Sequence, residues 1–300
     1  MTFTMGIDGG GTKLRVVVVD ETLQVCAEAN GETVNPSVVG HEVAAQRVQQ
    51  AIHEALNSIN LTPSQIAAVG VGIAGASVEH SEAWLRETIA PVLSDSRLAL
   101  SSDVEIALVG AHGQREGILL LSGTGSCAYG INAQGERLLV GGWGYLIGDE
   151  GSGYWMGRKA LRQVAIITDE KRRDDPSREF KAQVLDFLEI RTPRQMVKWI
   201  YGQGEAVPRV ATLAPLMIVM AQEGNPHAKQ IVTLGALRLV DHALQVCDQL
   251  NMTGPIAFAG GLLEKSFYYR QLVAESLGID VPMTKYAPVV GAALLAVISH

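Results

Sequence analysis

The chain contains 300 residues, which favours two domains, because a single hydrophobic core seldom grows beyond about 250 residues. A net charge of −7 and an aromatic content of 5% argue against a nucleic-acid or anionic-membrane partner, since both kinds of binding need a clustered basic surface. Hydrophobic residues make up 47% of the sequence, but no apolar run approaches the ~18 residues of a membrane span, and the chain enters a strand pattern rather than a signal segment, so we expect a cytoplasmic protein.

Three cysteines, Cys26, Cys127 and Cys247, lack the spacing of a metal site and cannot all pair with one another. This usage fits a reducing compartment and argues against a structural zinc or a disulfide framework. The seven histidines are scattered without paired metal-ligand spacing, so they predict no metal cage either.

The first predicted element is a β-hairpin around a glycine-rich turn. An apolar run at 5–7 leads through Asp8 into the turn 9–12, and a second strand follows at 13–19. Glycine has no Cβ, so the backbone N–H groups of such a turn can approach an anion closely. A strand follows the turn where a Rossmann fingerprint would open a helix, and the turn lacks the Gly-x-x-x-x-Gly-Lys-Ser/Thr motif, so an NAD-binding or P-loop fold is disfavoured. The turn is either an ordinary hairpin turn or the cradle of a phosphate group.

Strand and helix patterns then alternate, which indicates an α/β fold. In chain order the apolar spacing predicts a strand at 23–29, a helix at 44–59, a strand at 67–73, a helix around 84–89, a strand at 98–100 and a helix from 104.

A second hairpin, at 117–121 and 127–131, restarts this pattern and has 137–140 as its third strand. Its turn, 122–126, reads Ser-Gly-Thr-Gly-Ser. Two such turns about a hundred residues apart favour a pair of loops that cradle successive phosphates of a nucleotide. A repeat of the whole unit is therefore predicted.

The rest of the chain is mostly helical in pattern. Helices are predicted at 154–167, 194–201, 207–223 and 226–250, and the stretch 169–177, in which seven of nine residues are charged, is predicted to be an exposed loop. Strands at 256–259 and 281–285 and a final helix at 289–298 complete the prediction.

Five segments resemble, in their order, the superfamily of sugar kinases, heat-shock chaperones and actin ATPases. They are 6–12 and 122–126 as phosphate loops, 102–104 and 288–292 as connecting segments, and 259–261 as an adenosine segment. The glycine-rich stretch 141–153 is similar to a segment of amino-sugar kinases. Within the superfamily the chain resembles the BadF/BadG/BcrA/BcrD-type ATPase family, and in it the N-acetylglucosamine kinase-like members, over essentially its whole length.

The resemblance implies a two-lobed actin-like ATPase (ribonuclease H-like) α/β fold, in which each lobe has a mixed sheet with a three-strand meander and helices. Residues 1–113 and the terminal helix 288–300 would form the N-terminal lobe, residues 114–287 would form the C-terminal lobe, and ATP and sugar would meet between them. It also implies that ATP, with Mg²⁺, phosphorylates N-acetylglucosamine at its 6-hydroxyl, and that the chain forms a homodimer.

Phosphoryl transfer needs loop amides, a metal and a base for the accepting hydroxyl. Asp8, at a strand end beside the first turn, is placed to hold Mg²⁺ through water, although a turn-capping Asp would have the same signature. Asp103 lies at a strand-to-helix junction, where a helix cap would also explain it. The resemblance makes Asp103 the general base that takes the proton of a sugar hydroxyl.

The resemblance also assigns the contacts to both substrates. Those to ATP are Asp8, Gly10, Gly11, Thr12, Gly123, Thr124, Gly260, Gly261 and Gly291, and those to the sugar are Asn35, Gly75, Gly125, Ser126, Trp143, Asp149 and Glu150. Trp143 can present a flat apolar face to a pyranose ring, and Asp149 and Glu150 can accept hydrogen bonds from its hydroxyls. A core Trp and an acidic pair at a loop end are the structural alternatives.

The acceptor stays open, because Cys127 stands where amino-sugar kinases often carry Asn, and Ala74 where some carry Ser. Glucosamine and N-acetylmuramic acid are alternative acceptors. A different class of function is an ATP-driven activator of a CoA-ester dehydratase or reductase, although the chain lacks the Cys-Ala-Ala-Gly-Thr-Gly arrangement of such relatives. A third is a regulatory protein that binds ATP and sugar without turnover.

Overall fold

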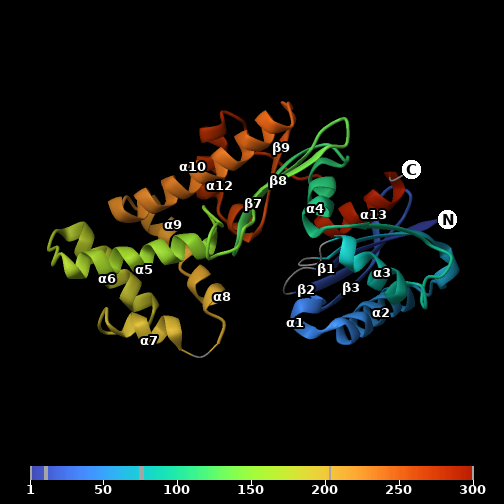
Figure 1. Ribbon diagram of the computed structural model, residues 1–300, viewed down its shortest axis with the longest axis horizontal. Helices are drawn as coiled ribbons and strands as arrows, with labels where there is room; N and C mark the ends of the chain where they lie inside the picture. Colours follow the sequence, from blue (N-terminus) through green and yellow to red (C-terminus); the bar gives the residue numbers. More distant parts are fainter. Residues whose placement is uncertain (1, 10–12, 74–77, 203, 299–300) are drawn as a thin grey trace. The chain divides into compact units, whose positions relative to one another are not determined.

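The computed structural model describes residues 2–9, 13–73, 78–202 and 204–298 (Figure 1). The chain divides into two compact units, one made of residues 1–119, 131–136 and 283–300 and the other of residues 120–130 and 137–282. Four residues that the sequence analysis placed in the phosphate and sugar sites lie outside the described residues, namely Gly10, Gly11, Thr12 and Gly75.

The first unit is built on a five-stranded sheet with the strand order β3-β2-β1-β4-β5. The strands are β1 (Phe3–Gly9), β2 (Lys13–Val19), β3 (Val25–Glu32), β4 (Ile66–Ile73) and β5 (Arg97–Ser101). The first three form an antiparallel meander, β4 runs parallel to β1, and β5 runs parallel to β4. The helices of this unit are α1 (Pro36–Val39), α2 (His41–Ser58), η1 (Pro63–Gln65), α3 (Val78–Ile89), α4 (Asp103–His112) and α13 (Pro288–Ile298).

Helices cover both faces of this sheet. On one face Leu14, Val16 and Val18 of β2 pack into a core with α2 and α3, whereas Val17 and Val19 pack on the other face against α13. Side chains of a strand alternate between its two faces, and here both faces are buried. This explains why β2 carries an unbroken run of valines.

Glycines let the helices on the second face approach the sheet. A Cβ added to Gly6 or Gly70 would collide with a carbonyl oxygen of α13. A Cβ on Gly72 would lie 2.6 Å from the Ile106 side chain of α4. Larger residues at these positions would push α13 and α4 away from β1 and β4.

The second unit holds most of a four-stranded sheet with the order β8-β7-β6-β9. Its strands are β6 (Gly117–Ser122), β7 (Ser126–Ile131), β8 (Arg137–Gly141) and β9 (Ile256–Ala259). The helices are α5 (Gly153–Asp169), α6 (Asp175–Phe187), α7 (Gln195–Tyr201), α8 (Ala206–Ala211), α9 (Ala214–Gln222), α10 (Pro226–Gln249), α11 (Gly261–Lys265) and α12 (Phe267–Leu277). The long helix α10 packs against α5, α9 and α12 (Figure 1).

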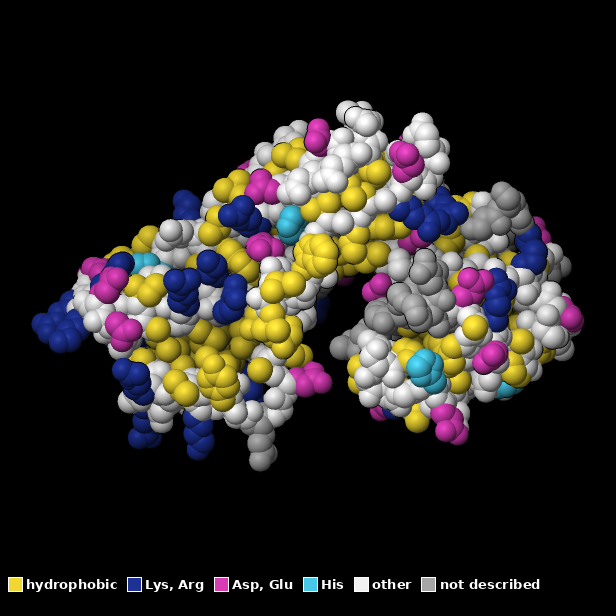
Figure 2. Space-filling model, in the orientation of Figure 1, with side chains coloured by type: hydrophobic (Ala, Val, Ile, Leu, Met, Phe, Trp, Pro, Cys, Tyr) yellow, Lys and Arg dark blue, Asp and Glu magenta, His cyan; other side chains and the backbone are white. Residues whose placement is uncertain are grey.

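Charge is spread unevenly over the second unit. Lys and Arg side chains gather beside α5 and α10 on the face drawn in Figure 2. Burial is the largest cause that lowers the pKa of Lys159, and the positive charges of Arg162, Arg158 and Arg238 lower it further. The net charge of the chain does not reveal this local basic group.

The unit boundaries differ from the expected lobes. Residues 114–119, 131–136 and 283–287, expected in the C-terminal lobe, group with the first unit. The N–H groups of Lys285 and Tyr286 donate to the last carbonyls of α4, at 3.0 and 2.9 Å. These bonds also replace the predicted strand at 281–285, which was wrong: the segment has no strand structure.

Two further predictions of secondary structure were wrong, and local chemistry explains both. The helix predicted at 207–223 is two helices, α8 and α9, because Pro215 lacks an N–H group and its ring clashes with the preceding turn. The loop predicted at 169–177 ends early, because Asp174 caps α6 by accepting from the Ser177 N–H at 2.9 Å. None of the described helices combines the length and the apolar character that crossing a membrane requires.

Candidate active site

The first unit places two acidic residues at one edge of its sheet. Asp8 of β1 pairs in register with Gly72 of β4, which pairs with Ser101 at the end of β5. Asp103 follows Ser101 by two residues and begins α4, whose N-cap is Ser102. Because the carboxyl ends of parallel strands meet at the same edge of a sheet, Asp8 and Asp103 come close together.

The two carboxyl groups have perturbed acidities. Burial, and then repulsion from Asp103, raises the pKa of Asp8 from 3.8 to about 6, while Arg15 opposes the rise. Burial also raises the pKa of Asp103, against the lowering effect of backbone N–H groups at the start of α4. A divalent cation bound here would offset the repulsion, and carboxylate oxygens are ligands that Mg²⁺ prefers. The pair therefore fits a metal ligand next to a general base.

Asn35 lies in a segment that rests on the end of β1. Val34 is fully buried, and its side chain would lie 2.7 Å from a Cβ added to Gly9. The Asn35 Oδ1 atom accepts from the Ser37 N–H at 3.0 Å and so caps α1. Among the described residues Nδ2 has no hydrogen-bond partner, which leaves it able to donate to a ligand.

The second glycine-rich turn, 122–126, joins β6 to β7 and is tied to the first turn of α5. The Gly123 carbonyl accepts from the Gly153 N–H at 2.7 Å, and the Thr124 carbonyl accepts from the Tyr154 N–H at 3.2 Å. The N–H groups of Thr124 and Gly125 have no partner in the described part of the chain. The turn is held in place while these two amides are left for an anion.

Gly125, Ser126 and Asp149 form one tight group. Asp149 Oδ1 accepts from the Ser126 N–H at 3.3 Å, and a Cβ on Gly125 would lie 2.9 Å from Asp149 Oδ2. The Ser126 hydroxyl donates to the Glu150 carbonyl at 2.8 Å. Burial raises the pKa of Asp149 despite the Ser126 N–H bond, and Glu150 adds to the rise. The four predicted sugar ligands Gly125, Ser126, Asp149 and Glu150 are thus brought together.

The predicted adenosine segment lies against the same turn. Gly260 has a φ of +89°, and a Cβ there would lie 2.6 Å from the Ser122 carbonyl oxygen. A Cβ on Gly123 would lie 3.6 Å from the Gly261 nitrogen. The chain after β9 therefore runs beside the turn after β6 with no side chain between them, which suits a surface for phosphate or ribose.

Two predicted site residues have other surroundings. Trp143 is 74% exposed, so the alternative of a core Trp is wrong; its neighbours Leu146 and Ile147 are also exposed. Gly291 is buried in α13, where an added Cβ would collide with the Ile106 carbonyl oxygen of α4. Its observed role is the close packing of two helices. The sugar contact of Trp143 and the nucleotide contact of Gly291 stay predictions.

Three side chains beside these groups were not anticipated. Arg15 stands opposite Asp8 in the β1–β2 ladder, a position that strand alternation could have revealed. His242 of α10 lies near Asp149, and its Nδ1 atom is buried without a hydrogen-bond partner in the described residues. Arg47 of α2 binds the segment before Asn35. The last two contacts join distant parts of the sequence and leave no local signal.

The first sheet begins with a three-stranded meander and carries acidic side chains at its carboxyl edge, and a second sheet with a glycine-rich turn follows it in the chain. These features define an actin-like ATPase fold, which solved sugar kinases share. The chain belongs to the BadF/BadG/BcrA/BcrD ATPase family, whose model matches residues 5–296.

Full-length relatives are found in bacteria and in an amoeba. An N-acetylmuramic acid/N-acetylglucosamine kinase of Clostridium acetobutylicum is 29% identical over 95% of this chain and 93% of its own. An N-acetyl-D-glucosamine kinase of Dictyostelium discoideum is 27% identical over 97% of both chains. A Chromobacterium violaceum protein, provisionally named N-acetylglucosamine kinase, has a crystal structure with a TM-score of 0.76 and 27% identity over 99% of both chains.

Proposed function

We propose that this chain is an ATP-dependent kinase of an amino sugar, with N-acetylglucosamine phosphorylated at its 6-hydroxyl as the foremost reaction. The observation that carries the proposal is the Asp8 and Asp103 pair, which offers a metal ligand and a base at one edge of the first sheet. Full-length similarity to kinases named for N-acetylglucosamine supports the choice of acceptor.

Asp103 is the proposed general base. Its raised pKa moves its basicity toward neutral pH, where a base is most effective. It would take the proton of the sugar hydroxyl while that oxygen bonds to the γ-phosphorus and the bond to the bridging oxygen of ATP breaks, which releases ADP. The backbone N–H groups at the start of α4 would hold the carboxylate in its place.

Asp8 is the proposed ligand of Mg²⁺, held through water, and Arg15 favours its ionised form. The bound ion supplies positive charge where negative charge gathers on the transferred phosphoryl group. We also propose that the enzyme works in the cytoplasm as a homodimer.

The remaining proposed contacts follow the two substrates. For ATP they are Gly10, Gly11, Thr12, Gly123, Thr124, Gly260, Gly261 and Gly291, and for the sugar Asn35, Gly75, Gly125, Ser126, Trp143, Asp149 and Glu150. The turn amides of Thr124 and Gly125 and the Nδ2 atom of Asn35, which have no partner among the residues that the structure describes, support these roles.

The proposal is tested by ADP release from Mg²⁺-ATP with N-acetylglucosamine, glucosamine, N-acetylmuramic acid, N-acetylmannosamine or glucose, against a control without sugar. Stimulation by N-acetylglucosamine well above the other sugars is the expected result. Stimulation by glucosamine or N-acetylmuramic acid instead would move the acceptor within the class. A rate of ADP release that no sugar changes would overturn the kinase proposal and favour an ATP-driven activator.

A further inference from the structure

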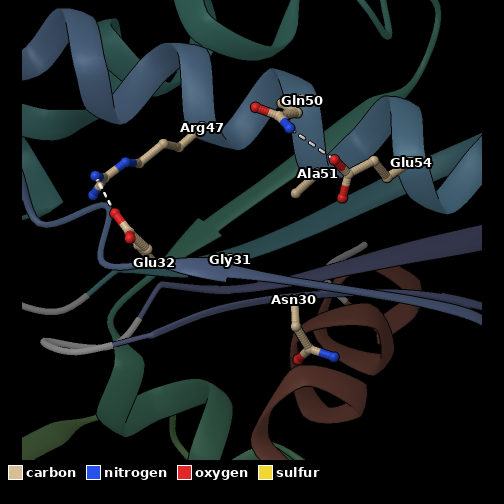
Figure 3. A pocket seen from close by; sticks show the side chains of 7 residues that line it. All are labelled: Asn30, Gly31, Glu32, Arg47, Gln50, Ala51 and Glu54. Carbon is tan, nitrogen blue, oxygen red and sulfur yellow. Dashed lines mark hydrogen bonds and ion pairs between the residues drawn. The ribbon is translucent and has the colours of Figure 1, made fainter.

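The first unit has a surface pocket of about 270 Å³ between the end of β3 and α2. Its lining residues are Asn30, Gly31, Glu32, Arg47, Gln50, Ala51 and Glu54 (Figure 3). Figure 3 shows Arg47 reaching from α2 to Glu32 at one side of the pocket, while Gln50 pairs with Glu54 at the other. In the Arg47–Glu32 pair, Glu32 lies three residues before Asn35, a proposed sugar ligand.

Arg47 is one contact away from the backbone of Asn35. Its Nη1 atom donates to the Thr33 carbonyl oxygen at 2.6 Å, and Nη2 forms an ion pair with Glu32. The Thr33 hydroxyl oxygen accepts from the Asn35 N–H at 3.2 Å. The guanidinium group of Arg47 therefore binds the Thr33 carbonyl directly. Through the Thr33 hydroxyl it also helps to hold the backbone N–H of Asn35, whose side chain is the proposed sugar donor.

Arg47 makes this contact from a fixed base. Its neighbours on α2, Val48, Ala51 and Ile52, are at most 3% exposed and belong to the core beneath the helix. A guanidinium group is planar and presents its donors in a rigid fork, so two bonds from it fix a direction as well as a distance. On the opposite, apolar side the segment is anchored by buried Val34.

We infer that Arg47 is a positioning residue for the amino sugar: it fixes the segment 32–35 so that the Asn35 Nδ2 atom stands ready to donate to the sugar. The inference rests on the proposed function. Arg47 does not contact the sugar in this scheme, and it acts only through Thr33 and Asn35.

The test compares three variants of the whole protein. Arg47→Met keeps the aliphatic stem and removes the fork, and we expect the KM for the amino sugar to rise about 10- to 100-fold, with kcat and the KM for ATP within about twofold. Arg47→Lys restores one charged donor and recovers part of the loss. Glu54→Gln is the matched control, since it removes a carboxylate from the other side of the same pocket and leaves both bonds of Arg47, and its KM stays close to that of the wild type.

Hydrogen exchange of the Asn35 and Ser37 amides, followed by NMR, reports positioning without turnover, and we expect it to be faster in Arg47→Met. Because the pocket is open to water, the variant leaves no sealed cavity, so its melting temperature should change little. An unchanged sugar KM, an equal rise in Glu54→Gln, or unchanged exchange would overturn the inference while the kinase function stands. A wild-type protein without sugar-dependent turnover would instead overturn the proposed function, and exchange would then decide whether Arg47 holds the segment.

Discussion

The ionised carboxylates of Asp8 and Asp103 lower the stability of the native state. Burial raises both pKa values, so the unfolded chain carries these carboxylates in their charged form more readily than the native state does. For Asp8 the native pKa of about 6 exceeds the unfolded value of 3.8. Its destabilising effect is therefore absent below pH ~4, grows between pH ~4 and ~6, and is complete above that range.

We accordingly expect Asp8→Asn to be more stable than the wild type at pH 7.5, by about 1–3 kcal/mol, while kcat falls by at least about 100-fold. Urea unfolding in the absence of metal measures the first effect and ADP release the second. The stability gain should shrink toward pH 4.5. Asp95→Asn, at an exposed position on the same unit, is the control for loss of a carboxylate. A less stable Asp8→Asn would contradict the buried-charge argument.

The Asp103→Asn variant separates catalysis from binding. Asn is close to Asp in shape but cannot accept the proton of the sugar hydroxyl, so kcat should fall by about 10²–10⁴-fold. The KM values for ATP and sugar should stay within a few-fold of those of the wild type, because the base contributes little to ground-state binding. Steady-state kinetics with the sugar and ATP varied separately checks both expectations. Retention of the wild-type kcat would remove Asp103 from the role of base.

At the scale of elements, glycines decide how closely segments of the backbone approach one another. In the first unit they bring α4 and α13 onto the sheet, and in the second unit they bring β9 and the segment 149–151 onto the turn after β6. Gly125 is the tightest case beside a proposed ligand, with the Asp149 carboxylate 2.9 Å from an added Cβ. A side chain there must displace the carboxylate, since the turn itself is hydrogen-bonded to α5.

We therefore expect Gly125→Ala to raise the KM for the amino sugar or lower kcat by about tenfold or more, as the Ser126 N–H bond to Asp149 is lost. Gly31→Ala is a suitable control, because its Cβ would meet the nearest atom, in Leu14, at an ordinary 3.5 Å. Kinetics and thermal melting of both variants give the comparison. Equal activity of Gly125→Ala and the wild type would place the sugar away from Asp149.

The sequence predicts the elements well wherever the hydrophobic period and the glycine turns act together. The strand pairs of both hairpins, the strand 256–259 and the terminal helix are confirmed, because their signals are local. Two of the failures have different causes. Pro215 splits the helix predicted at 207–223, a local signal that the hydrophobic period does not carry. At 281–285 the deciding contact is long-range, since the Lys285 N–H donates to a carbonyl of α4.

The candidate site shows the same limit. Asp8 and Asp103 are marked by their places at strand ends, so the sequence and the family resemblance pointed to them. No sequence pattern marks Arg47 or His242 as a site residue. Arg47 reaches Thr33 only because α2 packs beside that segment, and His242 lies near Asp149 only because α10 packs beside residues 149–151. Such pairings follow from tertiary packing, which no spacing of residues displays.

For the whole molecule, ligand binding should appear as stability. A non-hydrolysable ATP analogue at 100 times its Kd, together with Mg²⁺, should stabilise the native state by about 2.7 kcal/mol. Removal of the metal with EDTA should abolish most of this gain, and Asp8→Asn should respond to the analogue equally with and without Mg²⁺. Scanning calorimetry measures all four states. Undiminished stabilisation in EDTA would contradict the metal role of Asp8.

The packing of α13 on β1 and β2 has a consequence for biosynthesis. The strands β1 and β2 leave the ribosome well before the helix that covers Val17 and Val19, which lies at residues 288–298. At about 5–20 residues per second, this valine surface waits on the order of 15–60 s for its cover. During that interval the nascent chain presents an incomplete sheet, so aggregation or chaperone capture competes with folding until α13 has been made.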